Sequence, residues 1–374
     1  SKKPVKRLWI SSLEDSAILD GMQHLRSAEE YRHLAEAAVC RSQADWLVGM
    51  NATRAYTTKY FKKLTVGRVQ TPTLAMLVER AGQISNFQKE KYFNVELDCD
   101  GIPAVKPKIF DPDEAEQLRS RCHGNEAIVT SVKETEKKVK APKLYDLTTL
   151  QREANRIYGM TAKQTLDTAQ SLYEKKLITY PRTDSQYLTE DMEQTARNVV
   201  RQIYEKYQLT GPFDQPEQPD VKKVMNNSKV TDHHAIIPTV ELASCHLDEL
   251  KSWEEKILFL IAVHTVMAMS KDHIYLETEV EVECQGECFK AKGKSVLQDG
   301  WKIYENCFKN PDRLAILDPA QEMKEQMPKV TEGQKFYAVT AEKTEHYTSP
   351  PKPYSDVIFC ERKEWIGIEE RSSA

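Results

Sequence analysis

Apolar side chains recur at helical spacing through residues 12–82. Ser27-Ala28-Glu29-Glu30 has the sequence of a capping box, and it is followed by a run in which Tyr31 and Leu34 fall on one helical face. The pattern therefore predicts a helical segment over residues 1–86.

The pattern changes to strict alternation near Phe87. Phe93, Val95 and Leu97 alternate with polar residues, and the same alternation returns from Ile274 to Val282. Such alternation is typical of strands with one face packed and one face in water. It predicts two β-rich stretches, over residues 87–146 and 268–342.

A mostly helical stretch, residues 147–267, separates the two β-rich stretches. Leu147 to Tyr158 has helical spacing, Gly159 is a natural helix stop, and Thr161-Ala162-Lys163-Gln164 is a second capping box. Helix, glycine turn, helix and then strand is the order of a helix-turn-helix or winged helix, although many helical hairpins bind nothing. The predicted fold class is α+β with several domains, in which a helical domain is inserted into a β domain.

Composition narrows the class of protein. The chain has 374 residues, 40% hydrophobic and 29% charged, and no apolar run long enough to span a membrane. The net charge of −4 excludes a uniformly basic coat, so a nucleic acid would be held by local clusters. Eight scattered cysteines form no C-x-x-C pair, which indicates reduced thiols of a cytoplasmic protein and no zinc site.

The most informative chemistry lies at Tyr180. The run Leu177-Ile178-Thr179-Tyr180 has the composition of a short strand, and Arg182 follows two places later. Side chains at i and i+2 of an extended segment point to one side, so a phenol and a permanent cation would face one phosphate. A tyrosine placed in this way could attack a phosphodiester and become covalently bound to it.

Five stretches in this order resemble the type IA DNA topoisomerases, and the last of them, with two adjacent histidines and Ile-Ile-Pro, resembles the bacterial topoisomerase III branch. They are Arg7-Leu8-Trp9-Ile10-Ser11-Ser12, Arg41-Ser42-Gln43-Ala44-Asp45-Trp46-Leu47-Val48-Gly49, Val66-Gly67-Arg68-Val69-Gln70-Thr71-Pro72-Thr73-Leu74, Thr179-Tyr180-Pro181-Arg182-Thr183-Asp184-Ser185 and Asp232-His233-His234-Ala235-Ile236-Ile237-Pro238-Thr239.

The resemblance implies a role for each matching residue. Tyr180 would be the nucleophile that forms a 5′-phosphotyrosyl link, Arg182 would assist at the phosphate, and His233 would contact the phosphate near the scissile bond. The remaining residues would contact the single DNA strand or shape its site, with Asp184 orienting Arg182 or the loop. These are Arg41, Thr65, Arg68, Gln70, Gln170, Thr179 and Asp184.

The residues themselves suggest three further details. Two adjacent histidines seldom face one site, so His234 is expected to pack rather than to react. Gly67 permits close backbone approach, and Gln70 would point the same way as Arg68 if the segment were extended. Tyr60 and Phe61 could stack on bases, but a core position is favoured for both.

The family's N-terminal Toprim domain, with its Glu and Asp-x-Asp residues and Mg²⁺, has no counterpart before Arg7. The Asp98/Asp100 and Asp111/Asp113 pairs imitate Asp-x-Asp but sit in the β-rich region, where turn or strand-edge positions are expected. No Mg²⁺ is therefore expected on this chain. The first residues, Ser-Lys-Lys without a methionine, indicate an excised piece.

The resemblance thus implies the central part of a toroid-shaped, ATP-independent enzyme that relaxes negative supercoils and decatenates DNA. We expect a monomer that binds single-stranded DNA at the cytoplasmic nucleoid. Residues 343–374 would begin the return to the toroid base and end in an atypical tail from about residue 356.

Two alternatives come from other classes. A tyrosine recombinase needs His-x-x-Arg, which the stretch from His233 to Ile237 lacks. A non-enzymatic winged-helix DNA-binding module would use the helices of residues 147–267 alone.

Overall fold

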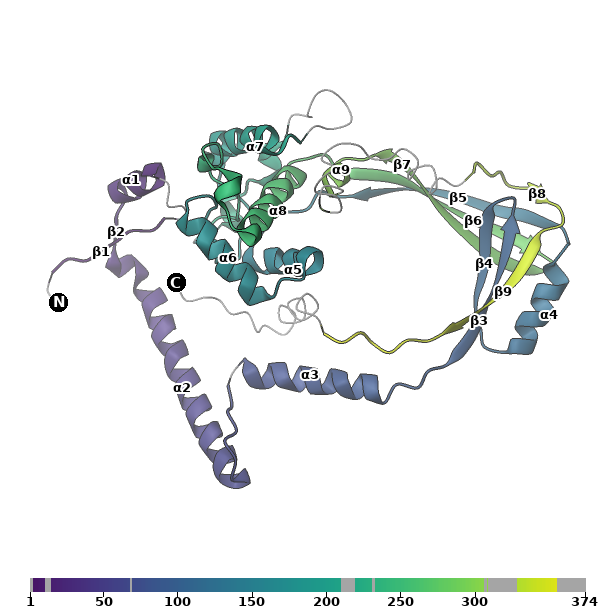
Figure 1. Cartoon of the computed structure of the whole chain (residues 1–374), viewed down its shortest axis with the longest axis horizontal. Coiled ribbons are helices and arrows are strands. Elements are labelled where there is room, and N and C mark those ends of the chain that lie inside the picture. Colours follow the sequence, from purple (N-terminus) through teal and green to yellow (C-terminus); the bar gives the residue numbers. More distant parts are fainter. Residues whose placement is uncertain are drawn as a thin grey trace.

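The elements of the chain follow an open, ring-like course (Figure 1). In the computed structural model the described residues are 3–10, 15–67, 69–209, 219–230, 233–305, 308 and 328–354. Arg68 and the predicted atypical tail from residue 356 lie outside them. No helix within the described ranges is long and apolar enough to cross a membrane.

The N-terminal part is helical, as predicted. Its elements are β1 (Lys6–Arg7), α1 (Asp15–Gln23), β2 (Arg26–Ser27), the 3₁₀ turn η1 (Ala28–Tyr31), α2 (Arg32–Tyr60) and α3 (Gln70–Ser85). The capping box is present, because the Ser27 hydroxyl accepts from the Glu29 N–H and the Ser27 N–H donates to Glu30. The expected core positions of Tyr60 and Phe61 are wrong. Their side chains are 55% and 95% exposed, since helix α2 buries none of its residues.

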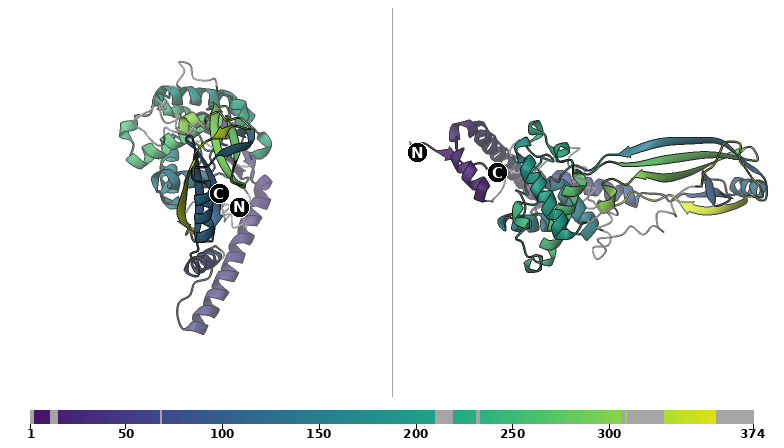
Figure 2. Two further views of the ribbon diagram at one scale, coloured as in Figure 1. Left: turned by 90° about the vertical axis from the view of Figure 1, so that its right-hand side faces the viewer. Right: turned by 90° about the horizontal axis from the view of Figure 1, so that it is seen from above.

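One antiparallel sheet of seven strands forms the far side of the ring (Figures 1 and 2). Its spatial order is β8 (Lys335–Phe336), β5 (Ala127–Val139), β6 (His273–Cys284), β7 (Glu287–Gln298), β4 (Ile102–Ile109), β3 (Lys91–Cys99) and β9 (Thr340–Tyr347). Helix α4 (Pro112–Cys122) packs against β3 and β9. The strand alternation predicted from the sequence is confirmed, with Phe93, Val95 and Leu97 in the core below α4.

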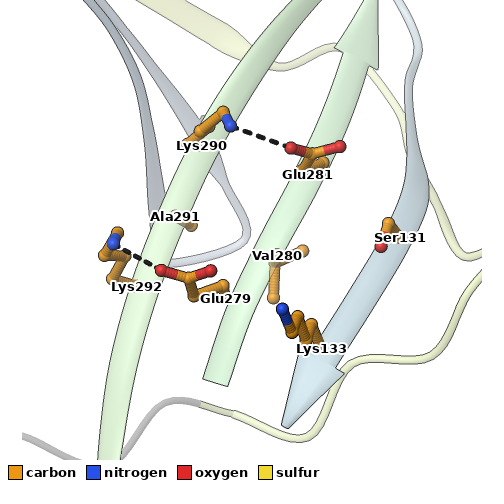
Figure 3. A pocket seen from close by; sticks show the side chains of 8 residues that line it. All are labelled: Ser131, Lys133, Glu279, Val280, Glu281, Lys290, Ala291 and Lys292. Carbon is orange, nitrogen blue, oxygen red and sulfur yellow. Dashed lines mark hydrogen bonds and ion pairs between the residues drawn. The ribbon is translucent and has the colours of Figure 1, made fainter. Parts of the chain in front are cut away.

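The two faces of the β5–β6–β7 ribbon differ. Val280 and Val282 of β6 point into the core, while their neighbours on the opposite face are glutamates. Figure 3 shows a hollow on this ribbon where Lys290 lies 2.9 Å from Glu281 and Lys292 pairs with Glu279 across the strands. Lys290 and Lys292 are already paired with glutamates, so we assign the hollow a structural role and not a part in the chemistry at Tyr180.

A helical unit lies between β5 and β6 in the sequence. The chain leaves the sheet after Val139 and re-enters it at His273, and these two residues are partners in the ladder. The unit contains α5 (Leu147–Tyr158), α6 (Ala162–Glu174), α7 (Glu193–Tyr207) and α8 (Ser252–Ala268), and α9 (Lys302–Glu305) packs on it after β7. Its apolar core is separate from that of the sheet.

The helix limits of this unit agree with the predicted stop and start signals. Gly159 ends α5 with a left-handed φ of 68°, and Thr161 with Gln164 forms the capping box of α6. Helix α8 is buried around nearly its whole circumference and forms the centre of the unit. Because α6 packs on α8, the position of the segment that follows α6 depends on this contact.

A buried carboxylate ties α6 to α8. Glu254 is only 3% exposed, and its side chain accepts from Ser171 Oγ at 2.7 Å and Lys175 Nζ at 2.6 Å. Burial opposes ionisation of Glu254, but the hydrogen bonds from Lys175, the Lys251 N–H and Ser171 outweigh it and lower its pKa to about 2. The charged form is therefore the form that stabilises the fold.

This pair makes stability depend on pH with a definite sign. The folded pKa of Glu254 lies below its unfolded value, so its contribution is complete above about pH 5 and is lost as the pH falls toward 2. We expect Glu254→Gln to lower the free energy of unfolding by about 2 kcal/mol at pH 7, with a difference from wild type that narrows as the pH falls from 5 to 3. Urea denaturation measures both. Glu255→Gln, on the exposed side of α8, is the matched control, and equal behaviour of the two variants would contradict the assignment.

Candidate active site

Two chain segments run antiparallel to form the floor of the site. After α6 ends, the Thr179 N–H donates to the Ile237 carbonyl and the Thr239 N–H donates to the Leu177 carbonyl, each at 3.0 Å. The predicted strand is shorter than expected. It is a single bridge between Ile178 and Pro238, and its pairing stops before Tyr180.

Thr179 fastens the two segments with its side chain. Its hydroxyl donates to the Ala235 carbonyl and accepts from the Ile237 N–H, both at 3.0 Å, and the residue is 3% exposed. Farther along, Thr183 Oγ1 donates to the His233 carbonyl at 3.1 Å. The loop that carries Tyr180 is therefore held to the segment that carries His233 at points on both sides of the tyrosine.

This pairing brings the Tyr180 ring against the His233 ring. The two ring centroids are 4.4 Å apart with planes inclined at 43°, and Tyr173 of α6 packs its edge on Tyr180 at 5.4 Å. Tyr180 is half-buried, whereas Arg182 and Asp184 are exposed on the loop that follows. A half-buried phenol with an imidazole beside it and a guanidinium two residues away is equipped to meet a phosphate at the surface.

Only one of the two histidines reaches Tyr180, as predicted. His234 is 9% exposed, and its Nδ1 lies 2.8 Å from the Ala235 carbonyl oxygen. Burial lowers the pKa of His234 and favours its neutral form. Its role is packing within the segment that positions His233.

The N-terminal segment supplies residues for which no role was predicted. Trp9 stacks on His233 with centroids 5.4 Å apart and on Tyr31 at the same distance. The Arg7 guanidinium carbon lies 5.3 Å and 5.2 Å from the centroids of the Trp9 and Tyr31 rings. The sequence did contain a signal for this contact. The stretch from Arg7 to Ser12 resembled the family, although none of its residues had been given a role.

The residues predicted to contact the single DNA strand do not all lie near Tyr180. Arg41 on α2 is half-buried, as is Gln170 on α6, whose Nε2 donates to Glu174 at 3.1 Å. Thr65 and Gln70 are exposed in the connection after α2, which the hydrogen bond from Val66 N–H to Thr53 Oγ1 fixes beside the second half of that helix.

Thr65 and Gln70 lie well away from Tyr180. Thr53 is 22 residues along the chain from Tyr31, which corresponds to roughly 30 Å of helix. Gln70 is the first residue of α3 and not part of an extended segment, and the Thr71 N–H donates to the Gly67 carbonyl.

The described residues do not fit a magnesium site. No group of three or more His, Cys, Asp or Glu side chains that could hold a metal occurs among them. The Asp-x-Asp imitations are turn and cap residues. Asp98 accepts from the Gly101 N–H at the β3–β4 turn, and Asp111 caps the N-terminus of α4.

Comparisons with known proteins agree with this geometry. A family model described as DNA topoisomerase matches residues 29–361. DNA topoisomerase 3 of Bacillus subtilis is 39% identical over 95% of this chain and 49% of its own length, and that of Staphylococcus saprophyticus is 38% identical over 82% and 44%. Full-length topoisomerase I from Thermotoga maritima is similar in structure, with a TM-score of 0.74, 25% identity, and 97% and 58% coverage.

The chain spans about half the length of the curated relatives it matches. The family model nevertheless covers most of the chain, including Tyr180, Arg182 and His233. The chain therefore belongs to the DNA topoisomerase family, in its type IA, topoisomerase III-like branch.

Proposed function

We propose that this chain carries the strand-cleaving tyrosine of a topoisomerase III-like enzyme, which cuts and rejoins single-stranded DNA through a 5′-phosphotyrosyl intermediate. The observation that supports it most is the contact of the Tyr180 and His233 rings, two residues before the exposed Arg182 in the same loop. These groups sit on a helical unit that hangs between β5 and β6 and faces the N-terminal segment (Figures 1 and 2).

The proposed reaction is a balanced transesterification. The Tyr180 oxygen forms a bond to phosphorus, the bond from phosphorus to the 3′-oxygen breaks, and the phenol proton is lost while the 3′-oxygen gains one. One phosphate ester replaces another, so the reverse attack by the 3′-hydroxyl restores the strand without ATP. Arg182 and the His233 N–H would offset the charge that builds on the phosphoryl oxygens.

Tyr173 is the nearest rival nucleophile, and its surroundings disfavour it. Burial, and next the nearby Tyr180, raise the pKa of the Tyr173 phenol, which makes its phenolate harder to form. Tyr173 is also buried, whereas Tyr180 is half open to solvent beside Arg182. The nucleophile is therefore assigned to Tyr180.

The activity of the whole enzyme is a further part of the proposal. Relaxation of negative supercoils and decatenation would need the acid-base carboxylates and Mg²⁺ that the family relationship implies, held by residues other than those described. Arg41, Thr65, Gln70 and Gln170 would then mark the course of one DNA strand toward Tyr180, with Arg68 between them in sequence. We infer a monomer that acts on nucleoid DNA in the cytoplasm.

The nucleophile can be tested in the full-length protein that carries this sequence. We expect Tyr180→Phe to abolish the covalent complex with a single-stranded oligonucleotide while changing the dissociation constant less than about threefold, because only the attacking oxygen is removed. Tyr173→Phe is the matched control and should keep cleavage. Covalent complexes are counted on denaturing gels with DNA labelled at each end. Cleavage that survives in Tyr180→Phe would reject the assignment and leave a DNA-binding module or another nucleophile.

Arg182 is expected to act on the transition state rather than on binding. Arg182→Ala should slow cleavage by a factor of about 10²–10³, and Arg182→Lys should recover only part of the rate because a point charge replaces a planar fork. Arg197→Ala, which breaks an exposed ion pair with Glu193 on α7, is the control and should be neutral. Single-turnover cleavage rates at saturating DNA decide between these outcomes. Equal rates for Arg182→Ala and wild type would contradict the role.

A further inference from the structure

We propose that Trp9 is a positioning residue for His233, so that the catalytic groups are complete only when the N-terminal segment is docked on the helical unit. The proposal rests on the cleavage function proposed above for Tyr180. Its starting point is that His233 contacts two rings from different parts of the chain, Tyr180 at 4.4 Å and Trp9 at 5.4 Å between centroids.

The backbone at His233 is held by hydrogen bonds, and its ring is stacked by Trp9. The His233 carbonyl accepts from Thr183, and the neighbouring Ala235 N–H donates to the Tyr187 carbonyl at 2.9 Å. These bonds act on the backbone, and the imidazole has ring contacts of its own with Tyr180 and Trp9. Trp9 lies nearly parallel to the imidazole, with 16° between the planes, and such stacking favours one ring orientation over the others by a several-fold factor.

Trp9 is itself held in place by its own segment. Tyr31 stacks on it with 12° between the planes, and Arg7 lies over both rings. The β1–β2 ladder pairs Arg7 with Arg26, and the Ser27–Glu30 capping box fixes the turn that ends at Tyr31. The Trp9 indole is thus held in place by a small folded unit, and it can restrict the orientations of the His233 imidazole that stacks on it.

An ion pair also joins these two parts, and it is weak. Lys176 Nζ lies 2.7 Å from Asp15 Oδ1, and the side chains are 42% and 85% exposed. Their hydrogen bond raises the pKa of Lys176 and lowers that of Asp15, but an exposed pair of this kind contributes little to holding the parts together. The Trp9–His233 stack instead links docking of the N-terminal segment to a ring that contacts Tyr180.

The first test reads the ring itself, in the 374-residue chain with ¹³C-labelled histidine. His233→Asn identifies the His233 signal. We expect Trp9→Leu to move the imidazole Hε1 resonance downfield, because the ring-current shielding of the indole is lost, while Trp9→Phe keeps most of the shift. Trp253→Leu is the matched control, since this half-exposed indole contacts Lys256 on α8 instead. An unchanged His233 resonance in Trp9→Leu overturns the proposal.

The second test reads the chemistry, in the full-length protein with a single-stranded oligonucleotide. Trp9→Leu should slow single-turnover cleavage by about three- to tenfold, with Trp9→Phe close to wild type and the dissociation constant for DNA within about twofold. Trp9→Leu with an altered resonance but wild-type cleavage overturns the positioning role. If wild type forms no covalent complex, the proposed function of Tyr180 fails instead, and the resonance still decides whether Trp9 orients His233.

Discussion

The candidate site depends on one short antiparallel contact, in which the segment from Leu177 to Thr179 lies along the segment from Ala235 to Thr239. The contact joins positions that are 56 and more residues apart in sequence. Its hydrogen bonds are buried, so each would cost more to leave unmade than it contributes when formed. The consequence is a tyrosine and a histidine held ring to ring at the end of the paired region.

Helix α8 and the β5–β6 ladder both support this contact. Helix α8, buried nearly all around, receives α6 through the Glu254 carboxylate and so fixes where the tyrosine segment begins. The β5–β6 ladder then carries the entire helical unit at one end of a long ribbon, with paired charges on its outer face. A rigid unit on a long ribbon suits a site that must meet DNA and another part of the protein at the same time.

Much of this arrangement could be predicted from local sequence. Helix caps, the helix stop at Gly159 and the strand with Phe93, Val95 and Leu97 follow from interactions between residues that are close in sequence. The structure confirms all of them. The motif around Tyr180 also indicated the correct family. Asp98 lies at a turn, as expected, whereas Asp111 caps the start of a helix that was not predicted.

What could not be predicted depends on contacts distant in sequence. Nothing local shows that Trp9 meets His233, because stacking depends on how two separate units dock. Tyr60 and Phe61 are large apolar residues of the kind found in cores, yet both are exposed at the end of α2. Helical spacing alone does not show whether another element packs against that face of the helix.

The central claim is that Tyr180 becomes covalently joined to the 5′ side of a broken DNA strand. Mass spectrometry of peptides from denatured, nuclease-trimmed complexes of the full-length protein with single-stranded DNA tests it most directly. We expect one modified peptide, with a nucleotide attached through its 5′-phosphate to the Tyr180 oxygen. A nucleotide on any other residue, or one attached through its 3′-phosphate, would contradict it.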